Sequence, residues 1–197
     1  MTDQIDSLAN PVARHRTPDQ ILGPFFPLTR VHVERCDLTV TEGSDGIAQG
    51  EIIEVIGRIL DRNGDPVRGA GLIIWQANTF GRYLHPGDAN PSPLDPNFAG
   101  STEIRSNGDG MYRIKTVKPG AYPVGPDWMR PPHIHFEVHG RFERLVTQMY
   151  FPDEPLNAND RLLNSALRPD LLIATPVLWP DQPGHRVLNF DIVLARG

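Results

Sequence analysis

The sequence predicts an all-β protein, with a β-sandwich core of mixed short strands, long loops and little helix. Three observations support this prediction. Short runs rich in β-branched residues are separated by turn signals of Asn, Gly and Pro. The 197 residues include 20 prolines and 18 glycines, which favour tight turns over long helices. Only one stretch, around residues 160–167, has a convincing helical pattern.

The expected strands follow from these runs and from the turns that end them. The first run ends at Asn63-Gly64, a strong tight-turn signal, and Asn107-Gly108-Asp109-Gly110 leads into another alternating run. In chain order, the expected strands cover residues 52–60, 70–77, 111–117, 134–138, 145–151 and 187–194. Between residues 80 and 101 the periodicity is lost, and a long loop of this kind in a compact domain is often functional.

The whole chain, residues 1–197, is predicted to form one domain, with residues 1 to about 16 as a flexible N-terminal arm. The following segment, residues 17–27, places apolar residues between prolines. This pattern is typical of an extended arm, either a strap over its own core or a contact with another subunit.

Charge and cysteine content restrict the partners and the compartment. The formal net charge of −5 argues against nucleic acid or an anionic membrane surface as the main partner. Cys36 is the only cysteine, so no intramolecular disulfide can form, as expected for a reducing compartment. No stretch approaches the roughly 20 apolar residues of a membrane helix. We therefore expect a cytoplasmic protein.

His133 and His135 are the strongest functional signal in the sequence. They are separated by one residue in a strand-like run, so both imidazoles should lie on one face of a strand. Such a pair offers two nitrogen ligands to a metal ion, although two buried histidines bonded to backbone would give the same pattern. Glu137 continues the same face and is a rival ligand in a His/His/Glu site.

Two tyrosines are candidates for anionic oxygen ligands. Tyr122 lies in Pro119-Gly120-Ala121-Tyr122-Pro123, a rigid turn, and Tyr83 lies in the long loop after the Trp75 strand. Composition alone favours a packing role for both. With two phenolates added to two imidazoles, the site would suit a hard trivalent ion better than zinc.

These motifs, taken together and in order, resemble the intradiol ring-cleavage dioxygenases, and most of all the catalytic (beta) subunits of the protocatechuate 3,4-dioxygenases. The resemblance covers about residues 17–195. The motifs are Gly23-Pro24-Phe25-Phe26, Trp75-Gln76-Ala77-Asn78, Gly81-Arg82-Tyr83, Leu94-Asp95-Pro96-Asn97-Phe98, Pro119-Gly120-Ala121-Tyr122-Pro123, Arg130-Pro131-Pro132-His133-Ile134-His135-Phe136, Thr147-Gln148-Met149-Tyr150-Phe151 and Phe190-Asp191-Ile192-Val193-Leu194.

The resemblance implies a non-haem Fe(III) held by Tyr83, Tyr122, His133 and His135. It also implies that Tyr122 leaves the iron and takes a proton from the substrate. Arg130 matches the family's active-site arginine, which stabilises negative charge on the substrate, and Gln148 matches a glutamine near the site. The implied reaction uses O2 to cleave a catechol-type ring between its adjacent hydroxyls, giving a cis,cis-muconate.

The substrate and the assembly have alternatives. Protocatechuate, giving 3-carboxymuconate, is the first expectation. Protocatechuate enzymes carry a tryptophan where Val124 stands, so hydroxyquinol or a substituted catechol is the alternative. A homo-oligomer is expected, with an alpha-type partner subunit as the other option. A noncatalytic sandwich, acting as a binding module or an alpha-type subunit, is the remaining reading, but the ligand set argues against it.

Overall fold

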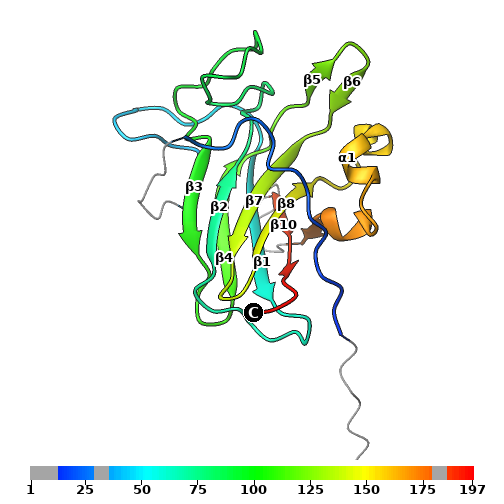
Figure 1. Cartoon of the computed structure of the whole chain (residues 1–197). Coiled ribbons are helices and arrows are strands. Elements are labelled where there is room, and N and C mark those ends of the chain that lie inside the picture. The colour runs from blue at the N-terminus through cyan, green and yellow to red at the C-terminus, as the bar shows by residue number, and fades with distance from the viewer. Residues whose placement is uncertain (1–12, 29–35, 179–185) are drawn as a thin grey trace, which may run out of the picture.

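The structure is a computed structural model, and it describes residues 13–28, 36–178 and 186–197. Two β-sheets pack face to face, and a separate two-stranded hairpin projects from one end (Figure 1). This arrangement confirms the predicted β-sandwich with little helix. The expectation that the arm is flexible up to about residue 16 stays a prediction, because residues 1–12 lie outside the described part.

The first sheet is built around its longest strand, β1. Its neighbours are β4, which pairs antiparallel with β1, and β10 and β11, which both pair parallel with it, while β9 extends the sheet beyond β10. The bounds are β1 Ile52–Leu60, β4 Met111–Val117, β9 Thr175–Val177, β10 Arg186–Asn189 and β11 Ile192–Val193.

The second sheet has the strand order β3-β2-β7-β8, and every pair in it is antiparallel. Its strands are β2 Gly71–Trp75, β3 Ser101–Arg105, β7 His133–His139 and β8 Arg144–Tyr150. The hairpin consists of β5 Tyr122–Gly125 and β6 Trp128–Arg130.

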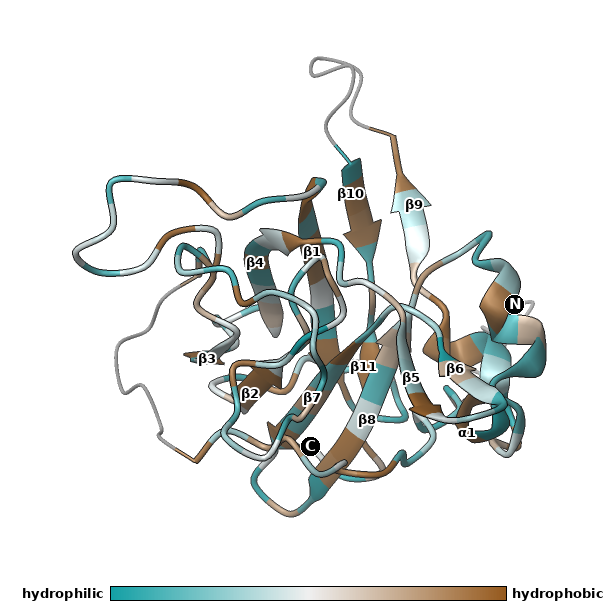
Figure 2. Ribbon diagram, turned by 90° about the horizontal axis from the view of Figure 1, so that it is seen from above, coloured by the Kyte–Doolittle hydropathy of each residue, from teal (hydrophilic) through white to brown (hydrophobic). Residues whose placement is uncertain are grey.

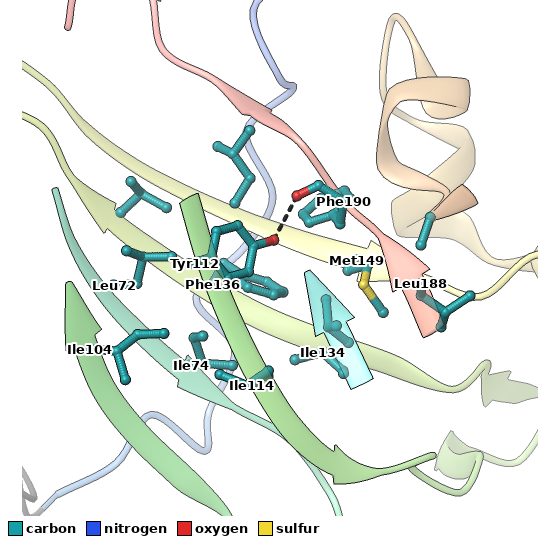
Figure 3. Close-up of a cluster of buried hydrophobic side chains, with 14 of the residues drawn as sticks. Leu72, Ile74, Ile104, Tyr112, Ile114, Ile134, Phe136, Met149, Leu188 and Phe190 are labelled. Atoms are coloured by element: carbon teal, nitrogen blue, oxygen red, sulfur yellow. Dashed lines mark hydrogen bonds between the residues drawn. The ribbon is translucent and has the colours of Figure 1, made fainter. Parts of the chain in front are cut away.

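The core lies between the two sheets, where alternate side chains from each sheet meet. Ile134 and Phe136 of β7 point into it and are fully buried, so His133 and His135 must lie on the opposite face of that strand. In Figure 3, Phe136 lies beside Tyr112 of β4, whose hydroxyl donates a hydrogen bond to the Phe190 carbonyl at 2.6 Å.

One expected strand is interrupted. Residues 187–194 form β10 and β11, with a break at Phe190 and Asp191. At the break, the Asp191 carboxylate accepts a hydrogen bond from the Arg58 amide at 2.9 Å. The Phe190 carbonyl lies so close to Gly57 that any side chain there would collide with it. At this point the Asp191 carboxylate takes the place of a backbone acceptor, and Gly57 leaves room for the Phe190 carbonyl, so the regular backbone pairing of the strand is interrupted.

The expected helix is shorter than predicted. The α1 helix covers Arg161–Asn164 only, with the 3₁₀ turns Pro155–Asn159 and Pro169–Leu172 on either side. The Asn164 side-chain amide donates to nearby backbone carbonyls, including that of Asp160 at 2.8 Å, and such local bonds compete with helix propagation. Seen from above, α1 and the hairpin lie beyond β8 (Figure 2). Among the described residues, no helix has the length and apolar character needed to cross a membrane.

The N-terminal segment, residues 13–28, which we call the arm from here on, runs across the second sheet on its outer face. Arg16 forms an ion pair with Glu143, the Gln20 amide donates to the Val146 carbonyl at 2.8 Å, and the Thr147 hydroxyl donates to the Pro18 carbonyl at 2.9 Å. The arm is therefore a strap over its own chain, as one of the two sequence-based alternatives expected.

Candidate active site

The outer face of the second sheet carries a row of functional side chains at one end. Strand register places His135 between Trp75 of β2 and Gln148 of β8, and it places His133 opposite Tyr150. All five side chains are nearly or fully buried, because the N-terminal arm and the loops cover this end of the face.

Tyr83 is held by the loop that follows β2. Its backbone amide donates to the Asp88 carboxylate at 2.7 Å, and the Asn78 side-chain oxygen accepts from the amides of Phe80 and Arg82. These are side-chain-to-backbone bonds of the kind that fix tight turns. The phenol ring is only 3% exposed.

Tyr122 comes from a second loop packed against the first. It is the first residue of β5, at the end of the turn predicted from its flanking prolines. The Gly120 amide donates to the Asn78 carbonyl at 2.9 Å. Gly81 has φ +79°, and a side chain there would strike the Ala121 carbonyl and crowd the Tyr122 Cβ. The two tyrosine loops therefore fix each other's position.

Four donor atoms converge between the sheet and the loops. Tyr83 Oη lies 3.1 Å from His135 Nε2 and 3.4 Å from His133 Nε2, and Tyr122 Oη lies 3.3 Å from His133 Nε2. The four predicted ligands, Tyr83, Tyr122, His133 and His135, are thus brought together.

The orientation of each imidazole is fixed from outside this group. His133 Nδ1 lies 2.7 Å from the Pro131 carbonyl, which can only accept, so Nδ1 carries the proton and Nε2 presents a lone pair to the tyrosines. The His135 ring stacks on Trp75 with centroids 4.8 Å apart, while its buried Nδ1 has no partner among the described residues. Stacking therefore sets the orientation of His135.

Burial keeps all four groups neutral in the absence of a cation. It lowers the pKa of His133 well below the usual value and lowers the pKa of His135 to about 3, and the nearby Arg130 charge adds to both effects. Burial also raises the pKa of Tyr83 well above 10, helped by Tyr122, and raises that of Tyr122, against the opposing effect of Arg130. Neutral imidazoles are ready to act as ligands, whereas the phenols need a strong cation to ionise.

The spacing of the donors fits a single metal ion. Bonds of about 2.0–2.1 Å, as in zinc–imidazole sites, would place neighbouring donors about 2.9 Å apart at right angles and about 3.4 Å apart at the tetrahedral angle. The observed separations of 3.1–3.4 Å fall within this range. Two phenolic oxygens would contribute two negative charges, which suits a hard, highly charged ion.

Arg130 and Gln148, the other predicted site residues, belong to one buried network beside the donors. Arg130 Nε donates to the Asp160 carboxylate at 2.8 Å, and its Nη2 donates to Gln148 Oε1 at 2.7 Å and to the Tyr150 hydroxyl at 3.0 Å. Burial opposes the charge on Arg130, but Tyr150, Tyr122 and Asp160 outweigh it and raise the arginine pKa. Gln148 Nε2 donates in turn to the Ile21 carbonyl of the arm.

A cavity of about 430 Å³ opens in front of the donors. Tyr122, Arg130 and His135 are among the residues that line it. The N-terminal segment contributes residue 21 and residues 23–25 to the lining, and the Tyr83 loop contributes residues 88–91. Its size is within the range of small-molecule sites, about 300–1,000 Å³.

The rival ligand Glu137 is engaged elsewhere. Its carboxylate forms an ion pair with Arg144 at 2.7 Å and a hydrogen bond with His139 Nε2 at 2.5 Å. Burial raises the pKa of Glu137, but the Arg144 and His139 contacts outweigh this effect and lower it. Within the described residues, no group of three or more His, Cys, Asp and Glu side chains is placed to hold a metal ion. His85 lies outside the cavity as well, with its ring 5.6 Å from that of Phe25.

Several residues of the site escape sequence reasoning. Asp160, Tyr150 and Asp88 contribute through hydrogen bonds, and Ile21 and Leu162 through the cavity wall. Tyr150 lies within one of the motifs that carry the family resemblance, and Asp160 begins the predicted helix, but neither pattern by itself indicates a place in the site.

Comparisons with known proteins show which family the chain is similar to. A model of the dioxygenase family matches residues 21–196. The protocatechuate 3,4-dioxygenase beta chain of Burkholderia cepacia is 46% identical over 166 residues, which cover 80% of this chain and 70% of that protein. The hydroxyquinol 1,2-dioxygenase of Rhizobium sp. (strain MTP-10005) is 34% identical over 165 residues, 74% of this chain but only 53% of that protein.

A solved structure shares the architecture over nearly the whole chain. The dioxygenase domain of a dioxygenase–carbohydrate-binding fusion from Streptomyces sp. SirexAA-E superposes with a TM-score of 0.71 at 30% identity, covering 93% of this chain and 100% of that one. The match to the family model extends over nearly all of the sequence. This chain therefore belongs to the intradiol ring-cleavage dioxygenase family.

Proposed function

We propose that Tyr83, Tyr122, His133 and His135 hold a non-haem Fe(III), and that the protein uses O2 to cleave an aromatic diol between its hydroxyls to a cis,cis-muconate. The observation that supports this most directly is the convergence of two phenolic oxygens and two unprotonated imidazole nitrogens at separations of 3.1–3.4 Å. Membership of a family that typically uses Fe(III) supports the choice of metal.

When bound, ferric iron would lower the pKa of the diol hydroxyls and make the ring reactive toward O2. The protein's own residues would manage the protons. Tyr122 borders the cavity, whereas Tyr83 is buried behind it. Tyr122 is therefore the ligand able to give way to an incoming hydroxyl. Its surroundings raise the phenol pKa, so the released Tyr122 oxygen would be a strong base for the substrate proton.

Arg130 would act on charge rather than on protons. Its guanidinium stays protonated, and it lines the cavity together with Tyr122 and His135. Asp160 and Gln148 hold it at 2.8 and 2.7 Å, so it is oriented before a substrate binds. A preorganised cation at this point would stabilise negative charge that develops on the substrate oxygens.

The visible spectrum tests the ligand set. The iron-loaded protein should be red-brown because phenolate-to-Fe(III) charge transfer absorbs visible light, and the band should shift when a catechol is added under anaerobic conditions. Tyr122→Phe should shift or bleach the band, whereas the matched control Tyr112→Phe should keep it, since the Tyr112 hydroxyl bonds only to the distant Phe190 carbonyl. A colourless protein after Fe(III) loading, with metal binding lost in Glu137→Gln, would favour the His/His/Glu site instead.

We also infer that the protein assembles into oligomers, as one type of subunit or with an alpha-type partner. A homologue is named as a beta chain, which supports the second arrangement. Large apolar side chains near the site are open to solvent, among them Leu28 at 73% and Leu84 at 63% exposure, which supports a subunit contact there. Size-exclusion chromatography with mass detection on the chain expressed alone distinguishes a self-sufficient oligomer from a monomer that needs a partner.

A further inference from the structure

The arm meets the buried hydrogen-bond network of Arg130 at two points. Gln148 Nε2 donates to the Ile21 carbonyl at 2.9 Å, and the Tyr150 hydroxyl lies 3.3 Å from Gln20 Oε1. Gln148 Oε1 and the Tyr150 hydroxyl are also the two acceptors of Arg130 Nη2, at 2.7 and 3.0 Å. The arm therefore contacts both groups that orient this nitrogen of the guanidinium.

The bond to Ile21 decides which atom of the Gln148 amide faces Arg130. A guanidinium only donates and a backbone carbonyl only accepts, so a single orientation of the amide satisfies both neighbours. Gln148 is fully buried, so its NH2 group would lose a buried hydrogen bond if the Ile21 carbonyl moved away. Without that carbonyl, the amide oxygen would no longer be held toward Arg130 from both sides.

Gln20 orients Tyr150 in a comparable way. The Tyr150 hydroxyl accepts from Arg130 Nη2 and has one proton to donate. Three oxygens surround it: Gln148 Oε1 at 3.0 Å, Gln20 Oε1 at 3.3 Å and Asp160 Oδ1 at 3.4 Å. The first already accepts from Arg130 and the third from a backbone amide, whereas Gln20 Oε1 has no other donor among the described residues. Gln20 is therefore the acceptor that can take this proton while a lone pair of the hydroxyl faces Arg130.

Gln20 is itself fixed between β8 and α1. Its backbone amide donates to the Val146 carbonyl at 2.8 Å, and its side-chain amide donates to the Leu162 carbonyl at 3.3 Å. The other side of the guanidinium does not depend on the arm, because Arg130 Nε donates to the fully buried Asp160 at 2.8 Å. Loss of the arm contacts would therefore leave the charge paired but would loosen the direction of Nη2.

We propose that Gln20 is a positioning residue for Arg130, and that docking of the arm is coupled to the orientation of the guanidinium. The inference rests on the ring-cleavage function proposed above, in which Arg130 stabilises negative charge on the substrate oxygens. A cation that is held in the wrong direction slows such a reaction, because preorganised charge acts on the transition state. The coupling is reciprocal, so a change at Arg130 also loosens the arm.

Activity in two backgrounds separates positioning from a merely structural role of the arm. Gln20→Met removes the acceptor at similar side-chain length and should lower kcat/KM of the iron-loaded full chain about tenfold, with protocatechuate or catechol, whichever is cleaved faster. In Arg130→Lys, which keeps a charge for Asp160 but has no planar fork to orient, the same change should alter kcat/KM less than about twofold. The matched control Asp19→Asn should leave kcat/KM unchanged, since among the described residues that carboxylate pairs only with Arg16. No loss in Gln20→Met, or an equal loss in both backgrounds, would overturn the proposal.

Limited trypsin digestion tests the coupling without iron or turnover. Thr17 is only 2% exposed and its hydroxyl accepts from the Val193 amide, so trypsin can cut after Arg16 only when the arm leaves the sheet. In chelator-treated protein this cut should be at least about fivefold faster in Arg130→Lys than in the unchanged chain. Val138→Ala, a change in the core between the sheets, should not accelerate it. Equal rates in Arg130→Lys and the unchanged chain would contradict the coupling. If neither diol is cleaved, or if turnover in the lysine background is too slow to measure, the digestion still decides whether the arm and Arg130 are coupled, and only the first result counts against the ring-cleavage function.

Discussion

Replacing Asp160 by asparagine should destabilise the protein by about 3–5 kcal/mol, although the change is nearly isosteric. Asp160 is fully buried and balances the Arg130 guanidinium, which is itself only 4% exposed at the side chain. The asparagine oxygen can still accept from the Leu163 amide, as Asp160 does at 2.7 Å, so the helix cap is kept. The loss therefore isolates the cost of a buried arginine without its counter-charge. Asp160→Ala should cost about 1 kcal/mol more, because it also removes the cap.

Urea unfolding of a double-mutant cycle measures this directly. Arg130→Met and Asp160→Asn should each destabilise the protein, and the double variant should lose much less than the sum, because the second change removes the unpaired charge left by the first. The visible band provides a separate readout, since Arg130 borders the site and the variants should alter its position. A single-variant cost below about 1 kcal/mol with additive effects would refute the argument that the pair is electrostatically coupled.

Three further predictions concern the histidines, the core and the tyrosine loops. In chelator-treated protein, His133 and His135 stay neutral in the folded state but gain protons below about pH 6.5 in the unfolded state. The free energy of unfolding should therefore fall toward low pH by up to about 2.7 kcal/mol per pH unit. Equal urea midpoints at pH 7 and pH 5 would contradict this. Phe136→Ala empties a fully buried site and should cost about 3–5 kcal/mol, a fall in Tm of roughly 6–20 °C by calorimetry. Gly81→Ala should displace the Tyr122 loop and lower bound iron by elemental analysis, while Gly69→Ala, with a similar φ of +66° but open space around it, should not.

The sequence was most informative where side-chain chemistry and backbone preference agree. Residues 52–60 are rich in β-branched side chains, and residues 111–117 alternate between apolar and polar side chains. Both runs form strands at the predicted bounds. The β3 strand was missed because Ser101–Arg105 has only Thr102 and Ile104 turned inward, with no apolar run. The β5–β6 hairpin was missed because it contains Pro123 and, apart from Arg130, has no buried residue. Tertiary contacts, not local propensity, decide such segments.

The residues of the candidate site also fall into a group that local sequence patterns predict and a group that they do not. The ligand candidates could be found because His-x-His on a strand and tyrosines in turns are local patterns. Asp88 and Leu162, by contrast, enter the cavity through the packing of loops distant in the sequence, and nothing in their neighbours indicates it. The sequence also could not exclude Glu137 as a ligand, because its ion pair with Arg144 depends on the pairing of β7 with β8.

The parallel pairing of β1 with β10 and β11 has a consequence for synthesis of the chain. Arg58 bonds to Asp191, 133 residues later, and the Thr17 hydroxyl accepts from the Val193 amide across 176 residues. Neither contact can form until almost the whole chain has left the ribosome. Domains dominated by such long-range pairing fold slowly, and their unpaired strand edges stay exposed until folding is complete. We therefore expect the yield of active enzyme to depend on growth temperature and chaperone supply more than the modest chain length suggests.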